Sequence, residues 1–350
     1  MARGRTTIAD VARAAGVSKG LVSFALNDRP GVSSTTRDRI LAIARDLGWT
    51  PSLRARALST RRAFALGLVI ARDPGILAAD PFFPAMIAGI ETSLGPAGQT
   101  LVLSMVPDEA AEMASYRRLA ADDRVDGVIL TDLRVADPRI ALMSSLGLAA
   151  VTLGRPEGPS PYPAITLDDT AGIRQSVLHL AQLGHQRIAH VGGPEHMLHG
   201  RRRRETFVLA LHECGLAGDL TVETDFSAAS GAAATRHLLS LPHRPTAIVY
   251  ANDPMAIAGM GVAQRVGMRV PDDLSVTGFD GSDAGEYSNP PLTSVTTHAH
   301  EWGRVAAETL MLATTGGDAR DVDLCPAALL VRESTGAAPG RHAIESHSQT

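Results

Sequence analysis

The chain has 350 residues, of which 45% are hydrophobic, and its formal net charge is −4. This length predicts two or three domains with sizeable cores. No apolar run approaches the roughly 18 residues of a membrane-spanning helix, and the first residues, MARGRTT, lack the apolar segment of a signal peptide. We therefore expect no membrane association and a cytoplasmic location. Cys214 and Cys325 have no spacing partner for a metal site and are expected to be small buried side chains.

The charges are distributed unevenly along the chain. Residues 1–62 carry 12 Lys and Arg against 4 Asp and Glu, whereas the rest of the chain carries 21 against 33. Basic side chains neutralise DNA phosphates and release counterions, and an acidic surface is repelled by them. The N-terminal segment is therefore the part expected to contact nucleic acid.

Two short helices are predicted at the start of this basic segment. Thr7 and Asp10 have the spacing of a capping box, so the first helix begins after Thr7, and Gly16 ends it. Ser18 can cap the second helix. Apolar residues fall on one face of each helix: Ile8, Val11 and Ala12 in the first, and Leu21, Val22, Ala25 and Leu26 in the second. The pair predicts a helix-turn-helix, whose second helix enters the major groove of DNA; an ordinary helical hairpin is the alternative.

A third helix and a short fourth one follow. Ser33 caps the third helix, which ends at Gly48 and completes a core of roughly fifty residues that is marginal by itself. Residues 52–59 predict a helix too short to be stable alone in water, with Ala55 and Leu58 on one side. A linker with one buried leucine is the alternative interpretation.

The pattern changes from Phe64 onward, where apolar runs alternate with helical periodicity. Strands are predicted at 64–70, 100–106, 126–131, 148–153, 187–193, 246–251 and 274–279, and helices near 83–95, 109–121, 168–183, 201–214, 228–240, 253–266 and 299–314. Such alternation predicts an α/β fold with two parallel sheets covered by helices on both faces. Ligands of open parallel sheets bind outside the carboxyl ends of the strands, here in the cleft between the two sheets.

Sequence motifs for common enzyme chemistries are absent. The chain contains no G-x-G-x-x-G after the first strand, no G-x-x-x-x-G-K-[ST] and no G-x-S-x-G between a predicted strand and a helix. The pairs His196/His199 and His298/His300 are loosely spaced, and no Cys or carboxylate completes a tetrahedral metal set with them. We therefore expect no cofactor, no metal and no catalytic residues, and an enzyme that uses the cleft is a weaker alternative.

The helix-turn-helix segment resembles a known family. The words T-I-A-D-V-A-x-x-A-G-V-S-x-x-x-V-S-x-x-L-N, at residues 7–27, are similar to the N-terminal domain of the LacI/GalR family of bacterial transcription regulators. The resemblance continues through most of the chain in Pro81-Phe82-Phe83, Gly184-His185-Gln186-Arg187, Arg203 with Phe207, Ala251-Asn252-Asp253 and Gly278-Phe279-Asp280.

This resemblance implies a domain organisation. Residues 1–50 would form the helix-turn-helix domain, 51–62 the hinge helix, 63–335 the core that binds the effector and dimerises, and 336–350 a flexible tail. The core would be similar to a periplasmic sugar-binding protein, with two subdomains crossed by three connections. The first subdomain would take 63–163 plus 297–322, and the second 164–296 plus 323–335.

The resemblance also implies which residues contact DNA: Thr7, Ser18, Lys19, Gly20, Ser23, Phe24, Asn27, Ala55 and Leu58. Lys19, Gly20 and Phe24 match the base-reading positions, although Phe24 is alternatively a core residue. Lys19 can donate to guanine, Gly20 offers no side chain, and Phe24 can contact only an apolar group such as a thymine methyl. Leu58 matches a residue that wedges between base pairs in the minor groove and kinks the duplex.

The implied effector site lies in the cleft of the core and comprises Phe82, Arg203, Phe226, Asn252, Asp253 and Asp280. Asp280 follows a strand, so its carboxylate is expected to accept hydrogen bonds from two adjacent hydroxyls, while Arg203 can donate a bidentate fork. With Phe226 as an aromatic face, these groups suit a sugar, although a purine would use similar parts. Asp280 as a turn residue and residues 201–204 as a solvated run are the alternatives. Gly154 and Thr131 depart from the family's polar ligand contacts, which weakens the sugar interpretation.

The sequence thus predicts a homodimeric transcription regulator, most simply a repressor, that binds a pseudo-palindromic double-stranded operator. A small-molecule effector, a sugar or a purine, would control it by moving the two subdomains. A periplasmic-type solute-binding protein without DNA function is the alternative from another class; the basic N-terminal domain and the lack of a signal peptide argue against it. The tail after Arg332 has no leucine heptads, so a coiled-coil tetramer is not expected.

Overall fold

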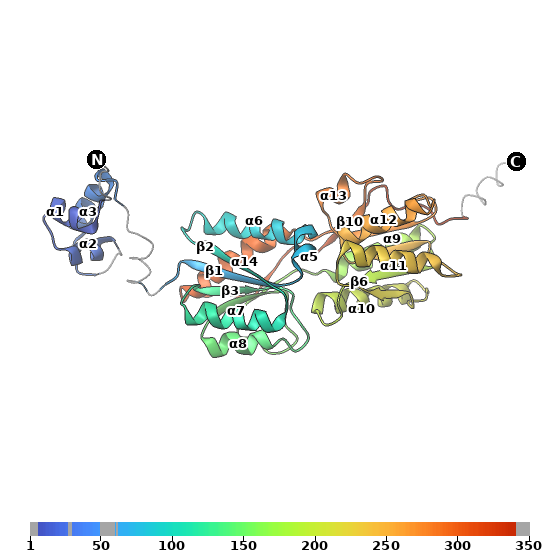
Figure 1. Cartoon of the computed structure of the whole chain (residues 1–350), viewed down its shortest axis with the longest axis horizontal. Helices are drawn as coiled ribbons and strands as arrows, with labels where there is room; N and C mark the ends of the chain where they lie inside the picture. Colours follow the sequence, from blue (N-terminus) through green and yellow to red (C-terminus); the bar gives the residue numbers. More distant parts are fainter. Residues whose placement is uncertain (1–5, 27–29, 50–59, 61, 341–350) are drawn as a thin grey trace. The chain divides into compact units, whose positions relative to one another are not determined.

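The computed structural model describes residues 6–26, 30–49, 60 and 62–340 of the chain (Figure 1). It divides into two compact units, Met1–Phe64 and Ala65–Thr350. The first unit is helical in its described part, and the second contains both sheets. The predicted fold class, a helical DNA-binding domain followed by an α/β core with two sheets, is confirmed.

The first unit contains three helices around one small core, namely α1 (Ile8–Ala15), α2 (Lys19–Leu26) and α3 (Ser34–Asp46). The predicted capping box is present, because the Thr7 backbone N–H and hydroxyl both donate to Asp10, over 3.0 and 2.7 Å. Gly16 ends α1 with φ 65°, a left-handed conformation that costs glycine little. Each helix contributes fully buried apolar side chains to the core, including Val11, Val22 and Ile40.

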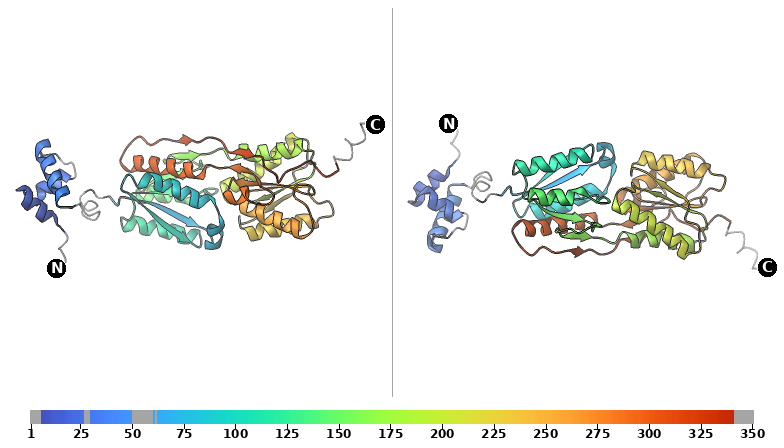
Figure 2. Two further views of the ribbon diagram at one scale, coloured as in Figure 1. Left: turned by 90° about the horizontal axis from the view of Figure 1, so that it is seen from above. Right: turned by 90° about the horizontal axis from the view of Figure 1, so that it is seen from below.

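The first subdomain of the second unit is built on a parallel sheet with the strand order β11-β5-β4-β3-β1-β2. The strands are β1 (Ala65–Ala71), β2 (Thr100–Val106), β3 (Gly127–Leu130), β4 (Ala149–Leu153), β5 (Ala164–Thr166) and β11 (Val322–Asp323). Helices α6 (Phe82–Leu94) and α14 (Ala299–Thr314) cover one face of this sheet, and α7 (Glu109–Ala121) and α8 (Pro138–Leu146) cover the other (Figure 2). The short helix α5 (Pro74–Ala79) follows β1.

The second subdomain has a sheet with the order β12-β10-β9-β8-β6-β7, in which only β12 is antiparallel to its neighbour. Its strands are β6 (Ile188–Gly192), β7 (Thr221–Glu223), β8 (Ala247–Tyr250), β9 (Ser275–Asp280), β10 (Thr293–Thr296) and β12 (Ala328–Leu330). Helices α11 (Ala228–Ser240) and α12 (Asp253–Arg265) pack on one face, and α9 (Thr170–Gln182) and α10 (Leu198–Glu213) on the other. The four-residue helix α13 (Asp283–Glu286) follows β9.

The chain crosses between the subdomains three times, as the family resemblance implied, but two expected boundaries are wrong. β5 hydrogen-bonds to β4 in the first sheet, so residues 164–166 belong to the first subdomain. The expected boundary between residues 322 and 323 falls inside β11. Both errors have one cause, because strands of two or three residues join the sheet edge without an apolar run to reveal them.

Two further expectations need correction. The tail was expected to begin at residue 336, but the Gly336 N–H donates to the Ser275 hydroxyl over 3.0 Å and the Ala338 N–H donates to the Leu183 carbonyl over 3.0 Å. These bonds hold residues 336–338 on the second subdomain. Of the two cysteines, Cys214 is half-buried and Cys325 is exposed, so neither is the fully buried side chain that was expected.

Candidate functional site

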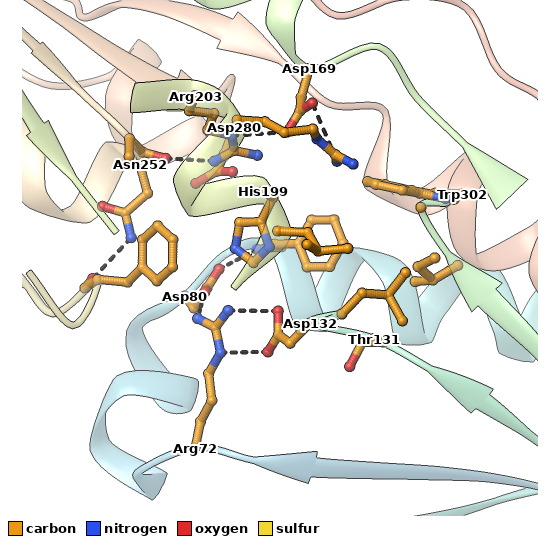
Figure 3. A pocket seen from close by; sticks show the side chains of 18 residues that line it. Arg72, Asp80, Thr131, Asp132, Asp169, His199, Arg203, Asn252, Asp280 and Trp302 are labelled. Carbon is orange, nitrogen blue, oxygen red and sulfur yellow. Dashed lines mark hydrogen bonds and ion pairs between the residues drawn. The ribbon is translucent and has the colours of Figure 1, made fainter. Parts of the chain in front are cut away.

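A cavity of about 80 Å³ lies between the two subdomains. The first subdomain lines it with Arg72, Asp80, Phe82, Thr131, Asp132, Leu133, Leu153, Gly154 and Trp302, and the second with Leu198, His199, Arg202, Arg203, Phe226, Ala251, Asn252 and Asp280, while Asp169 comes from the connection between them (Figure 3). Many of these residues stand at or just after the carboxyl ends of strands β1, β3, β4, β8 and β9. The cavity is therefore where two parallel sheets are expected to hold a ligand.

The wall from the first subdomain is organised by a buried ion pair. Arg72, just after β1, donates to both carboxylate oxygens of Asp132, just after β3, over 2.7 Å each, and its third contact is Asp80 at 3.4 Å (Figure 3). This fork is the geometry that strengthens a charged hydrogen bond. Although burial alone would raise it, the pKa of Asp132 is lowered to about 2 by the guanidinium of Arg72. Asp132 therefore stays charged at neutral pH.

The opposite wall presents a second arginine. Arg203, in the second turn of α10, donates to Asp169 over 3.2 Å and to the Ala251 carbonyl over 2.9 Å. Its guanidinium also lies 3.7 Å from the centre of the Phe279 ring. These contacts fix the plane of the guanidinium and use two of its five N–H donors, and Arg203 also lines the cavity.

Asp280 is the cavity residue with an unmet hydrogen-bond acceptor. Its Oδ2 atom is buried and has no hydrogen-bond partner in the described part of the chain. Burial raises the pKa of this carboxyl well above its usual range, and the neighbouring Asp80 and Asp253 carboxylates raise it further. The Asp280 backbone has φ 124°, a conformation that favours glycine. Strain and an unmet acceptor together are typical of a residue kept for binding rather than for stability.

An aromatic face stands beside this carboxylate. Phe226 stacks on His199 with ring centroids 5.3 Å apart and planes inclined by 15°. Phe226 has φ 70°, and the Asn252 side chain holds that backbone by donating to its carbonyl over 2.9 Å. A Cβ on Gly193 would lie 1.9 Å from the Phe226 ring, so only glycine leaves room for it. Burial lowers the pKa of His199 to about 3, so this histidine is neutral.

The structure brings together five of the six residues expected at the effector site: Phe82, Arg203, Phe226, Asn252 and Asp280 all line the cavity. Asp253 does not line it. Its carboxylate is buried and accepts from the Ser282 N–H and hydroxyl, over 2.7 Å each, and from the Ser294 hydroxyl over 2.5 Å. Asp253 therefore fixes the loop after β9. Asn252 caps α12 through its Oδ1 atom, so both of its polar atoms are used by the protein.

The sequence analysis did not predict the charged cavity residues Arg72 and Asp132 of the first subdomain, or the aromatic residue Trp302 of α14. Asp132 directly follows a predicted strand and Arg72 stands two residues after another, so the rule that ligands bind beyond the carboxyl ends of parallel strands, here called the strand-end rule, already pointed to them. Trp302 gave no signal of its own, because it lies in the first turn of a helix predicted only as cover for the sheet. Its indole N–H donates to the Ile165 carbonyl over 2.9 Å, and its ring meets Phe82 edge to face at 5.7 Å.

In the first unit, the predicted base-reading residues lie on the exposed face of α2. Lys19 and Gly20 are exposed, and Phe24 is 41% exposed, which argues against its alternative as a core residue. Ser18 accepts from the Leu21 N–H over 3.1 Å and thus caps α2, while Ser23 is half-buried and Thr7 is exposed. Asn27, Ala55 and Leu58 lie outside the described residues. The exposed side of α2 is available to a DNA groove.

Two absences hold for residues 6–26, 30–49, 60 and 62–340. There, no three His, Cys, Asp or Glu side chains are grouped to hold a metal ion. No helix there has both the length and the apolar character needed to span a membrane.

Comparisons with known proteins agree with both units. Residues 7–52 match the family of bacterial regulatory proteins, lacI family, and residues 177–335 match the periplasmic binding protein-like domain. The HTH-type transcriptional regulator CelR of Thermobifida fusca is 34% identical, covering 95% of this chain and 99% of its own. The HTH-type transcriptional repressor CytR of Escherichia coli (strain K12) is 31% identical, covering 95% and 97%.

Solved structures resemble the whole chain as well. A transcriptional regulator CelR-cellobiose complex matches with 33% identity and a TM-score of 0.72, covering 94% of this chain and 100% of its own. A lac repressor dimer bound to operator and the anti-inducer ONPF matches with 29% identity and a TM-score of 0.80, covering 95% and 99%.

A helix-turn-helix unit followed by a two-subdomain core with a charged cavity defines a DNA-binding transcription regulator that responds to an effector. With relatives above 30% identity along nearly its full length, this chain belongs to the lacI family of bacterial regulatory proteins. The predicted family and function are thereby confirmed.

Proposed function

We propose that this regulator is a homodimeric repressor, acting in the cytoplasm, whose operator affinity is controlled by a sugar bound in the cavity. The observation that carries the proposal is the buried Oδ2 of Asp280, which has no hydrogen-bond partner among the described residues and can therefore accept a hydrogen bond from a ligand. Sugar hydroxyls supply such donors, and the apolar face of a sugar ring packs on aromatic side chains such as Phe226. The cellobiose complex of a relative supports this class of ligand. The regulatory names of the relatives argue against the cleft being an enzyme active site.

The cavity groups that would act on the sugar divide into three kinds. Asp280 accepts from hydroxyls, and the remaining N–H donors of Arg203 donate to ring or hydroxyl oxygens. The Arg72–Asp132 pair offers polar contacts from the first subdomain. A ligand that bridges these walls binds one relative arrangement of the subdomains best, and it shifts the regulator toward that arrangement.

The DNA-binding half of the proposal is a pseudo-palindromic operator read by two copies of α2, one from each subunit. Lys19 and Phe24 are exposed for base contacts, and the lac repressor relative was solved as a dimer on its operator. Selection from a random DNA library should yield a two-fold symmetric sequence. An asymmetric consensus would contradict the dimeric arrangement.

A ligand screen tests the effector half. Full-length protein is heated with cellobiose, glucose, galactose, hypoxanthine or adenosine, because a ligand that binds only the folded state raises the melting temperature by mass action. We expect a concentration-dependent rise with a sugar and a parallel change in affinity for the selected DNA. A rise with hypoxanthine or adenosine alone would replace the sugar by a purine.

A further inference from the structure

One loop of the first subdomain takes part both in the cavity wall and in a contact across the cleft. This 131–137 loop lines the cavity with Thr131, Asp132 and Leu133. The Leu198 N–H donates to the Leu133 carbonyl over 2.8 Å, and the Val135 N–H donates to the His196 carbonyl over 3.0 Å. Arg134 and Met197 are thus paired like residues of two antiparallel strands. Because residues 196–198 lead directly into α10, the loop is bonded to the helix that carries His199 and Arg203.

The 131–137 loop is hydrogen-bonded to a buried charge pair that does not line the cavity. Arg139 of α8 and Glu112 of α7 are each 1% exposed and joined by a 2.7 Å contact. Arg139 also donates to the Asp132 carbonyl over 3.0 Å and to Asp137 over 2.6 Å. The other Glu112 oxygen accepts from Arg134 over 2.5 Å. The beginning, middle and end of the loop are therefore all bonded to this pair.

Such a pair is a poor source of stability, because desolvating two charges offsets most of their attraction, and apolar replacements are often neutral. Its geometric demand is strict, however. The planar guanidinium of Arg139 meets acceptors from α7, from Asp137 and from the loop backbone at once, and each bond requires one loop conformation. An apolar pair of the same volume would fill the space without imposing that conformation.

We propose that Arg139 and Glu112 are positioning residues of the effector cavity. They hold the 131–137 loop in the conformation that orients Asp132 toward Arg72 and pairs the loop with the start of α10. The charge pair thereby sets how readily the cleft closes around a ligand without touching that ligand. The inference rests on the proposed effector role of the cavity, but the positioning itself is measurable without any ligand.

The test is hydrogen exchange of the full-length, ligand-free protein, followed by mass spectrometry of peptides covering 131–137 and 195–200. In the double variant E112L/R139M, we expect at least tenfold faster exchange in both peptides, because the Val135 and Leu198 amides lose their partners more often. The double variant leaves Arg134 its contact with Glu109, and Asp137 keeps the backbone N–H groups of Arg134 and Arg139. The milder R139K keeps the charge without the fork and should accelerate exchange in the same two peptides.

A matched control is H185Q. His185 is also 1% exposed, and it contacts Thr246, Ser275 and the Gly336 carbonyl. It therefore helps to hold the segment at residue 336, which does not line the cavity. This variant should accelerate exchange around residue 336 and leave the two cleft peptides unchanged. Unchanged cleft peptides in folded E112L/R139M and R139K, or equal acceleration of them in H185Q, would overturn the proposal. If the double variant does not fold, R139K alone decides.

Titration with cellobiose, followed by protein fluorescence, separates this inference from the proposed function. If the wild type binds cellobiose, E112L/R139M should bind it at least tenfold more weakly, whereas H185Q should match the wild type. Equal affinity in all three would contradict the positioning role. A wild type that ignores cellobiose would count against that sugar, and the exchange result would still decide the role of Arg139 and Glu112.

Discussion

Replacing Asp280 by asparagine should stabilise the ligand-free protein and weaken effector binding. The wild-type side chain buries a carboxylate with one unmet oxygen, close to two other carboxylates. Asn keeps an unmet acceptor but removes the buried charge, so above the raised pKa, where Asp280 is ionised, a gain of about 1 kcal/mol is expected. For a protein of this size, that gain raises the melting temperature by about 2 °C. Effector affinity should fall about tenfold or more, because a charged acceptor contributes about 1.5–3 kcal/mol per hydrogen bond.

The pH dependence of folding stability tests the same prediction independently. Because the pKa of Asp280 is raised in the folded protein, the folded state binds this proton more tightly than the unfolded chain does. Wild-type stability attributable to Asp280 therefore falls as the pH rises from the ordinary Asp pKa through the raised one. D280N lacks this loss, so its stability advantage over the wild type should grow with pH across that window.

The assay is thermal unfolding at several pH values together with binding to the selected operator DNA. Asp253 provides the control, because it is also a buried carboxylate but its oxygens accept three hydrogen bonds. D253N should lower the melting temperature. If D280N is destabilised like D253N, or keeps wild-type effector affinity, our account of Asp280 is wrong. Operator binding without ligand should survive in D280N, giving a regulator that no longer responds to its effector.

Three further predictions follow from particular residues. G193A should lower effector affinity at least tenfold, because its Cβ would displace the Phe226 ring, whereas G158A, with no atom within 4 Å of its Cβ, should bind normally; isothermal titration compares them. L58A should weaken specific operator binding and spare non-specific DNA, since phosphate contacts remain when a minor-groove wedge is lost; equal loss on both DNAs in a gel-shift assay would contradict this. Effector affinity between pH 5 and 8 should show no titration from His199, because burial lowers its pKa to about 3. A change in affinity over this pH range that disappears in H199Q would contradict a neutral, buried His199.

The sequence predicted the long elements well because their signals are local. Strands such as β1 and β8 are buried on both faces and appear as continuous apolar runs. The strands β5, β7, β11 and β12, at or next to a sheet edge, have two or three residues each, too few to give a local signal. Helix α8 was missed although Asp137 and Pro138 form a good helix start.

The site was predictable only as far as the strand-end rule reaches. That rule brought Asp280 and Asn252 to the cavity, and it applies equally to Arg72 and Asp132. It failed for Asp253, which also follows a strand. The direction of that side chain depends on hydroxyl groups about 30 and 40 residues further along the chain, Ser282 and Ser294, and no local pattern encodes such a contact.

Coupling between ligand and operator requires that the cavity differ between two arrangements of the subdomains, because a ligand shifts an equilibrium only by its differential affinity. The charges of the cavity provide such a difference. Arg72 and Asp132 both belong to the first subdomain, so their ion pair does not cross the cleft. Asp280 belongs to the second subdomain, and its pKa is raised most by burial and further by the Asp80 carboxylate of the first, so two carboxylates face each other across the cleft. A ligand that donates hydrogen bonds to Asp280 relieves this repulsion in the closed arrangement, and it therefore favours closure by more than its contacts with either wall alone.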